Sequence, residues 1–85
     1  MLQILGKVVV KILQKKGKRW TKDQKPYDLA LVCDASGMKR YLSIFQDKFK
    51  FIEDGKVYEF RFVTLGLNGM SLTVGWNSTV EAMYN

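Results

Sequence analysis

Residues 27–45 read YDLALVCDASGMKRYLSIF, and this run predicts a β-hairpin. It opens with an apolar segment, residues 27–33, that carries one charge and is typical of a buried strand. Asp34-Ala35-Ser36-Gly37 follows, where the Asp and Ser side chains bond the backbone and glycine permits a positive φ, so a tight turn is expected. Residues 38–45 then pair back as the second strand.

The second strand of this hairpin has two chemically different faces, because side chains alternate along a strand. One face carries Met38, Arg40, Leu42 and Ile44. The other face carries Lys39, Tyr41, Ser43 and Phe45. We expect the first set in the core and the second outside, where aromatic rings beside a cation are the pattern of a base-stacking platform. For Phe45 the alternative is a second small core.

Upstream of the hairpin, residues 4–14 alternate and are rich in β-branched side chains, so they predict a strand rather than a helix. Lys7 and Lys11 belong to its outward-facing set. They either line a groove or protect an outer strand from edge pairing. Residues 15–26 are polar and contain a glycine and the only proline, and we expect a long loop there.

The positive charge of the chain is concentrated in that loop and the strand before it. The protein carries +6 overall, while segment 7–25 holds eight basic residues and one acidic residue, a net +7. An otherwise unexplained tryptophan lies among these cations. Single-strand binders need cations along the phosphates and aromatic faces for the bases. The segment therefore predicts nucleic-acid contacts, with a solvated basic loop as the alternative. The residues assigned to these nucleic-acid contacts are Lys7, Lys11, Lys16, Lys18, Arg19, Trp20 and Lys22.

Downstream of the hairpin, residues 46–54 have apolar side chains at helical spacing and predict a short helix ending at Asp54-Gly55. Residues 56–65 and 70–76 are rich in β-formers and predict a second hairpin around an Asn-Gly turn. Residues 80–84 fit either a terminal strand or one helical turn.

Several large side chains are assigned to the interior. Tyr58, Phe60 and Phe62 recur at a spacing of two, and a barrel needs such residues inside. Trp76 is expected to pack against the barrel, with a position facing a partner as the alternative. Cys33 is expected to be a small core residue rather than a nucleophile, since the chain has no histidine to act as its base.

The composition excludes most catalytic chemistry. The 85 residues contain no histidine and one cysteine, which rules out an internal disulfide, a histidine or multi-cysteine zinc site and a histidine-assisted triad. The acidic residues are dispersed and fit turns better than a magnesium site. We expect a non-enzymatic protein with no cofactor and no metal. The lone cysteine, with no secretory signal or membrane span, predicts a soluble intracellular protein, nuclear in a eukaryote and cytoplasmic in a bacterium or phage.

The expected elements match one small all-β fold. Five strands, a long first loop, a tight second turn, a short helix between strands three and four and a closing hairpin are the layout of a five-stranded Greek-key OB barrel. We expect one such domain over residues 1–85. An SH3-like barrel is the main alternative, but it would not ordinarily need the helical insert.

A series of four short motifs resembles the DNA-binding OB domains of replication protein A. The matching segments are 29–37, Arg40 with Ile44-Phe45, 47–49 and 55–60. The resemblance implies that single-stranded DNA binds in a groove across strands two and three, flanked by the loops after strands one and four.

Matched position by position, Phe45 takes the place of the family's stacking phenylalanine, and Lys39 and Arg40 take the places of backbone contacts. Residues 68–72 depart from the family, because they lack its second stacking aromatic. In this sequence that role would pass to Trp20, Tyr41 or Trp76.

The predicted function is non-catalytic binding of single-stranded DNA with little sequence preference, in replication, recombination or repair. RNA is an alternative ligand, although the closely spaced aromatic motifs of cold-shock-like barrels are absent. A different class of function is an OB module that docks a protein partner. Self-association or a partner subunit is compatible with either class.

Overall fold

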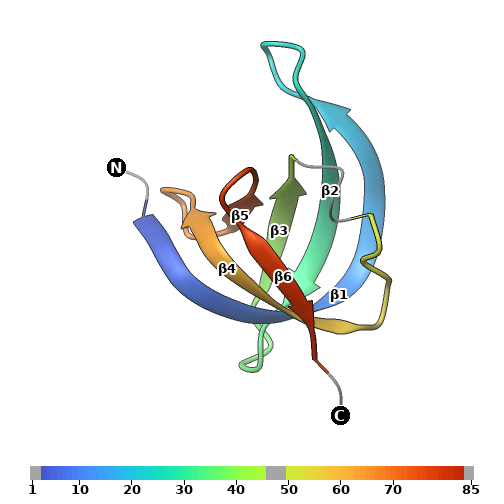
Figure 1. Ribbon diagram of the computed structural model, residues 1–85, viewed down its shortest axis with the longest axis vertical. Coiled ribbons are helices and arrows are strands. Elements are labelled where there is room, and N and C mark those ends of the chain that lie inside the picture. Colours follow the sequence, from blue (N-terminus) through green and yellow to red (C-terminus); the bar gives the residue numbers. More distant parts are fainter. Residues whose placement is uncertain (1–2, 46–49, 84–85) are drawn as a thin grey trace.

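The chain folds into a β-barrel with one added strand (Figure 1). The computed structural model describes residues 3–45 and 50–83. Its strands are β1 (Gln3–Trp20), β2 (Pro26–Cys33), β3 (Lys39–Ile44), β4 (Val57–Leu65), β5 (Ser71–Val74) and β6 (Thr79–Ala82). They follow the order β1-β2-β3-β5-β4-β6, and a further pairing of β1 with β4 closes a ring of the first five. This ring is the predicted Greek-key OB barrel.

Inward-facing side chains of the five barrel strands form one apolar core. As predicted, Leu42 and Ile44 of β3 point inward, and so do Tyr58 and Phe60 of β4, whereas Met38, predicted inside with the β3 pair, is 48% exposed. Cys33, also predicted inside, is only half-buried. Full burial of a side chain the size of leucine stabilises the fold by about 1.5–3 kcal/mol, so this cluster holds the barrel closed. The buried cluster is Val10, Ile12, Ala30, Val32, Leu42, Ile44, Ile52, Tyr58, Phe60, Val63, Leu72 and Val74.

Strand β1 is longer than predicted, and the expected long loop is mostly strand. β1 continues to Trp20 and pairs with β2 as far as Trp20↔Pro26. Two register shifts, between Ile12 and Gln14 and between Lys15 and Gly17, insert β-bulges that bend the strand. The polar composition was misleading because this part of the hairpin extends beyond the core, so backbone pairing holds it without an apolar face.

The predicted helix before β4 is wrong for the residues that the structure describes. Lys50 and Phe51 form a turn, and no helix occurs in ranges 3–45 and 50–83, so none there is long and apolar enough to cross a membrane. Residues 46–49, the rest of the prediction, lie outside the described residues. Ile52 is buried whereas Phe51 is exposed, so among residues 50–54 Ile52 is the apolar side chain that reaches the core.

Strand β4 has a kink that places Phe62 outside the core, contrary to the prediction. Phe62 has φ 60°, in the left-handed region, and its side chain is 57% exposed. The kink falls where β4 exchanges partners, pairing with β6 up to Arg61 and with β5 from Thr64. Val63 takes the inward position instead.

The C-terminal part of the chain bears on three further predictions. β5 forms a parallel pair with all of β3 from Tyr41 onward but an antiparallel pair with only two residues of β4. The predicted second hairpin is therefore short. Thr79–Ala82 is a strand rather than a helical turn. Trp76, which precedes it, is 78% exposed instead of packed against the barrel.

Candidate nucleic-acid interface

The outer face of β2 and β3 presents the aromatic and basic residues predicted for it. The pairs Cys33↔Lys39, Leu31↔Tyr41 and Leu29↔Ser43 share this face, because directly opposite residues of paired strands point to the same side. Tyr41 is 46% exposed, and its backbone N–H donates to the Met70 carbonyl at 2.9 Å, which fixes β3 against the β4–β5 loop. Its ring is therefore an accessible flat surface on a rigid strand.

Phe45 is the second aromatic residue of this face, and it is half-buried. Its ring stacks on Tyr27 of β2, with ring centroids 5.1 Å apart and an interplanar angle of 28°. The Phe45 backbone N–H donates to the Val74 carbonyl at 3.0 Å. Phe45 therefore fits the alternative of a small second core in part, because it packs on Tyr27. Both rings nevertheless remain at the edge of the outer face.

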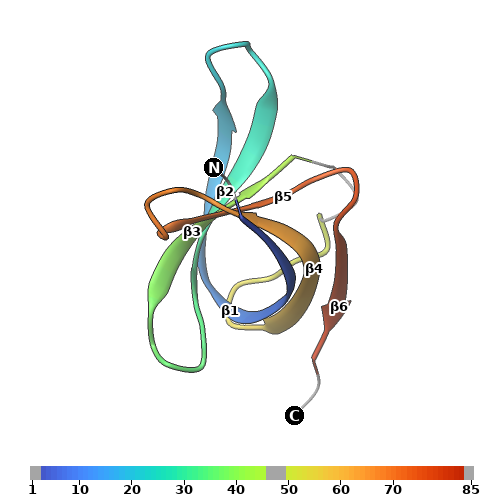
Figure 2. The ribbon, with the colours of Figure 1, turned by 90° about the vertical axis from the view of Figure 1, so that its left-hand side faces the viewer.

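The β1–β2 hairpin projects from the barrel as an arm (Figure 2). We call residues 15–27 the basic arm. Lys18, Arg19 and Lys22 are exposed on it, and within the described residues no acidic side chain forms an ion pair with them. Lys15 is different, because its ammonium group donates to the Ile52 carbonyl at 2.9 Å and anchors the base of the arm. Lys16 occupies the bulge and is half-buried.

Trp20 lies at the end of the basic arm and is 59% exposed. It pairs with Pro26, whereas the neighbouring Arg19 pairs with Tyr27. Side chains of successive residues point to opposite faces of a strand. Arg19 therefore lies on the same face as the Tyr27–Phe45 stack, and Trp20 lies on the other face of the arm.

The two lysines predicted on the first half of β1 have different surroundings. Lys7 lies 3.8 Å from Glu59, whose other oxygen accepts a hydrogen bond from Arg61 at 2.9 Å, so Lys7 belongs to a charge cluster on the β1–β4 side. Lys11 pairs with Cys33, which pairs in turn with Lys39. The structure thus joins Lys11 to Lys39 on the outer face and leaves Lys7 away from it.

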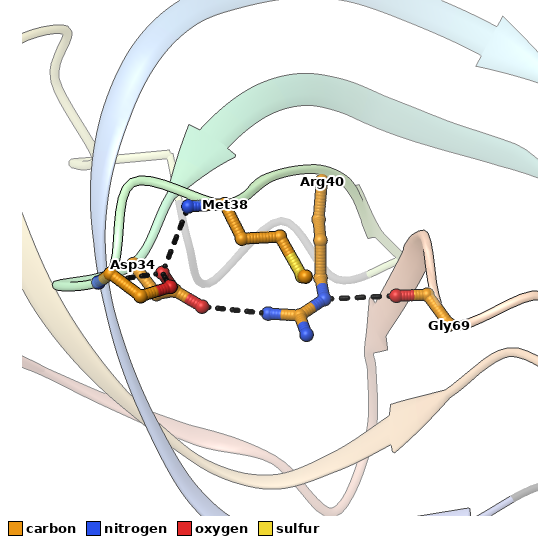
Figure 3. A network of polar contacts seen from close by, with 5 residues as sticks. Asp34, Met38, Arg40 and Gly69 are labelled. Atoms are coloured by element: carbon orange, nitrogen blue, oxygen red, sulfur yellow. Dashed lines mark hydrogen bonds and ion pairs between the residues drawn. The ribbon is translucent and has the colours of Figure 1, made fainter.

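Arg40 is engaged by the barrel itself (Figure 3). Its Nη1 lies 3.0 Å from Asp34 Oδ2, and its Nε donates to the Gly69 carbonyl at 2.9 Å. This side chain ties the β2–β3 turn to the β4–β5 loop. The contact to a nucleic-acid backbone that the resemblance implies for Arg40 stays a prediction, and it would have to share the guanidinium with these bonds.

Asp34 organises the β2–β3 turn. Its carboxylate accepts hydrogen bonds from the Ser36 hydroxyl at 2.6 Å and from the Ser36 and Met38 amides at 2.9 and 3.1 Å. The Ser36 hydroxyl first, then these amides and Arg40, hold the pKa of the Asp34 carboxyl below its ordinary value of 3.8. The turn is therefore fixed by an ionised aspartate.

The structure also exposes a group of apolar residues, of which the sequence analysis named only Trp76 as a candidate stacking residue. Ile4, Phe62 and Trp76 line one surface pocket, which lies where β1, β4 and β5 meet. The period-two pattern predicts Phe62 inside, and no local sequence signal marks the kink that turns it outward. In the described part of the chain, no three histidine, cysteine or acidic side chains come together as a metal site.

The closed ring of β1, β2, β3, β5 and β4, with an accessible outer face on β2 and β3, defines the protein as an OB-fold domain. Comparison of its sequence with protein families and with curated proteins gives no match. Solved structures share the fold at low identity. The Ifi202 HINa domain in complex with a 20-base-pair double-stranded DNA is 13% identical with a TM-score of 0.83, over 99% of this chain and 44% of that chain.

Two further structures give the same result. A murine DNA-binding protein bound to double-stranded DNA is 12% identical with a TM-score of 0.79, over 95% of this chain and 42% of that chain. A structure described as "Structural mimicry for functional antagonism" is 13% identical with a TM-score of 0.82, over 98% and 42%. This chain thus spans less than half the length of these solved chains. The likeness supports the OB fold; the narrower resemblance to replication protein A stays a prediction.

Proposed function

We propose that this OB-fold domain binds DNA and does no chemistry on it. The observation that carries the proposal is the basic arm, which continues into an outer face with an accessible aromatic ring. Lys18, Arg19 and Lys22 are exposed on this arm and form no ion pair with an acidic side chain of the described residues. DNA binding by the similar solved structures supports the proposal. The dispersal of ionisable groups supports a non-catalytic role.

Electrostatic capture is the first part of the mechanism. Lys18, Arg19 and Lys22 project from the arm and Lys11 and Lys39 lie on the adjoining face. Cations that contact phosphates release condensed counterions, so binding weakens steeply with salt. The charge of segment 7–25, +7 in a chain of +6, directs a polyanion to this side of the molecule.

Base stacking is the second part, and it favours single-stranded DNA. Tyr41 exposes its ring on the outer face, which the Tyr27–Phe45 stack borders, and Trp20 exposes its ring on the other face of the basic arm. A base in a duplex already stacks on its neighbours, whereas a base of a single strand gains about 1–3 kcal/mol by stacking on an aromatic side chain. We therefore propose single-stranded DNA, read with little sequence preference, as the preferred ligand, in replication, recombination or repair.

Double-stranded DNA is the second candidate. Two of the similar solved structures are described as complexes with double-stranded DNA. In that mode the basic arm would contact phosphates and the aromatic rings would contribute little. The two modes differ in their dependence on Tyr41.

The test is a titration of labelled oligo-dT, the matching duplex and the matching RNA, followed by fluorescence anisotropy at two salt concentrations. We expect oligo-dT to bind more tightly than the duplex. In the triple variant Lys18→Gln, Arg19→Gln, Lys22→Gln the salt slope should fall by about 2, at roughly 0.7 for each phosphate that the protein no longer neutralises. Lys56→Gln, an exposed lysine away from the arm, is the control and should bind like wild type.

Each outcome has a distinct meaning. Tighter binding of the duplex, unaffected by Tyr41→Ala, would replace the single-strand mode by the double-strand mode. No binding at low salt would overturn the proposal and leave docking of a protein partner as the leading function.

A further inference from the structure

Ile4, Phe62 and Trp76 form an exposed apolar surface that the proposed interface does not use. Their side chains are 72%, 57% and 78% exposed. They surround a pocket of about 350 Å³ whose other lining includes Thr64, Thr73 and Asn77. No charged side chain of the described residues lines this pocket. We call these three residues the aromatic patch.

The backbone of this patch is strained and held in place. A bulky side chain rarely adopts φ 60°, so the Phe62 conformation persists only because its surroundings enforce it. Ser78, which is 3% exposed, donates from its hydroxyl to the Phe62 carbonyl at 2.9 Å. The same hydroxyl accepts from the Gly75 N–H at 3.0 Å. One buried hydroxyl thus couples the kink in β4 to the turn that carries Trp76.

The aromatic patch is continuous with the outer face of β2 and β3. Residues that lie directly opposite one another in successive strand pairs form one row around the barrel. The row is Leu29, Ser43, Thr73, Thr64 and Ile4. Its middle is small and hydroxylated, so an extended ligand can lie close to the sheet. Gly75 of this pocket also lies beside Phe45 of the outer face, since a Cβ built on it would be at an ordinary contact distance of 3.9 Å from the Phe45 Cβ.

We infer that the aromatic patch is a second base-stacking site, which takes an unstacked nucleobase of a DNA strand already lying on the outer face. This inference rests on the proposed function. A nucleobase is flat and uncharged, and its edge hydrogen-bonds with amides and hydroxyls, which fits two aromatic rings beside Asn77 and Thr73. A duplex held by its phosphates would need cations here, and the described residues that line the pocket include none.

Tryptophan fluorescence provides a direct test, because the chain contains only two tryptophans. Trp20→Phe leaves Trp76 as the only tryptophan emitter. We would titrate this variant with oligo-dT of about 4 and about 12 nucleotides, the range of site sizes for one OB fold. Trp76 emission should be quenched by the longer oligonucleotide and unchanged by the shorter one.

Affinity should show the same length dependence. Trp76→Ala should weaken binding of the longer oligonucleotide by roughly 5- to 100-fold, the effect of removing the ring under one stacked base, and leave binding of the shorter one unchanged. Met83→Ala, an exposed apolar side chain away from the row, is the matched control and should bind both like wild type. Circular dichroism of each variant would check that the barrel is folded.

The possible failures are distinguishable. If the longer oligonucleotide binds tightly but Trp76 emission does not change, the inference is overturned and the proposed function stands. If neither oligonucleotide binds, the inference and the proposed single-strand mode are both overturned. If sedimentation shows self-association that Trp76→Ala abolishes, the patch belongs to a second copy of the chain and the inference is wrong.

Discussion

At the scale of single residues, Asp34 links the fold to pH. Its pKa is lowered because the Ser36 hydroxyl, two amides and Arg40 favour the ionised carboxylate. The Asp34 network therefore stabilises the folded state fully above the ordinary value of 3.8, and the contribution is lost as the pH falls below that value through the folded-state pKa. The turn between β2 and β3 should loosen in acid.

This predicts a specific pH profile. Asp34→Asn should lower the free energy of unfolding at pH 7 and make the remaining stability fall less between about pH 5 and about pH 2 than it does in the wild type. Urea denaturation at a series of pH values measures both. Asp23→Asn, a carboxylate in the β1–β2 turn outside this network, should keep the wild-type profile. Parallel profiles for Asp34→Asn and wild type would contradict the assignment.

Phe62 gives a second prediction at this scale. Glycine adopts φ 60° without strain, so Phe62→Gly should stabilise the barrel by about 1 kcal/mol, because removal of an exposed ring costs little. Phe62→Ala keeps the strain and should not stabilise. Urea denaturation of the two variants is the measurement, and equal stabilities would show that the φ angle carries no strain.

The contrast between Phe60 and Phe62 shows what sequence periodicity can predict. Phe60 and Leu42 lie in regularly paired parts of their strands, Phe60 opposite Val80 and Leu42 opposite Ala30, so alternation placed them in the core correctly. Phe62 lies where β4 leaves β6 and joins β5. That exchange is a property of the tertiary pairing, and a pattern of alternating residues in one strand contains no information about it.

At the scale of elements, the basic arm is a two-stranded extension of a barrel. Its sequence is polar because no core lies beneath it, and polar composition alone cannot separate a loop from a paired arm. The candidate site was nevertheless predictable in part, because the cations and Trp20 do lie together on this arm. How these residues divide between the two faces of the arm was not predictable, because the bulges after Ile12 and Lys15 set the register.

The arm predicts a separation of binding from stability. Trp20→Ala should change the free energy of unfolding by less than about 0.5 kcal/mol, because the ring is 59% exposed. The same change should weaken oligo-dT binding by about 1–3 kcal/mol, because one base has no ring to stack on. Trp20→Phe keeps a ring and should retain most of the affinity. A loss of stability without a loss of affinity would assign Trp20 to the fold instead.

At the scale of the whole molecule, the cations of the arm and most of the exposed aromatic surface occupy different places. The cations concentrate on the basic arm, while Tyr41, the Tyr27–Phe45 stack and the aromatic patch follow one another around the barrel. Long-range attraction governs how fast a polyanion arrives, and short-range contacts govern how slowly it leaves. The arm and the barrel face should therefore control different rate constants.

Stopped-flow kinetics with oligo-dT can resolve these two contributions. The Lys18→Gln, Lys22→Gln variant should lower the association rate constant at low salt by several-fold and approach wild type at high salt, where its charges are screened. Tyr41→Ala should leave association unchanged and raise the dissociation rate constant by roughly 5-fold or more, since a bound base then has no ring to stack on. Lys56→Gln, which removes one cation away from the arm, is the control and should associate like wild type. If Lys18→Gln, Lys22→Gln changed only dissociation, the arm would be a contact surface rather than a capture device, and the order of events proposed for binding would be wrong.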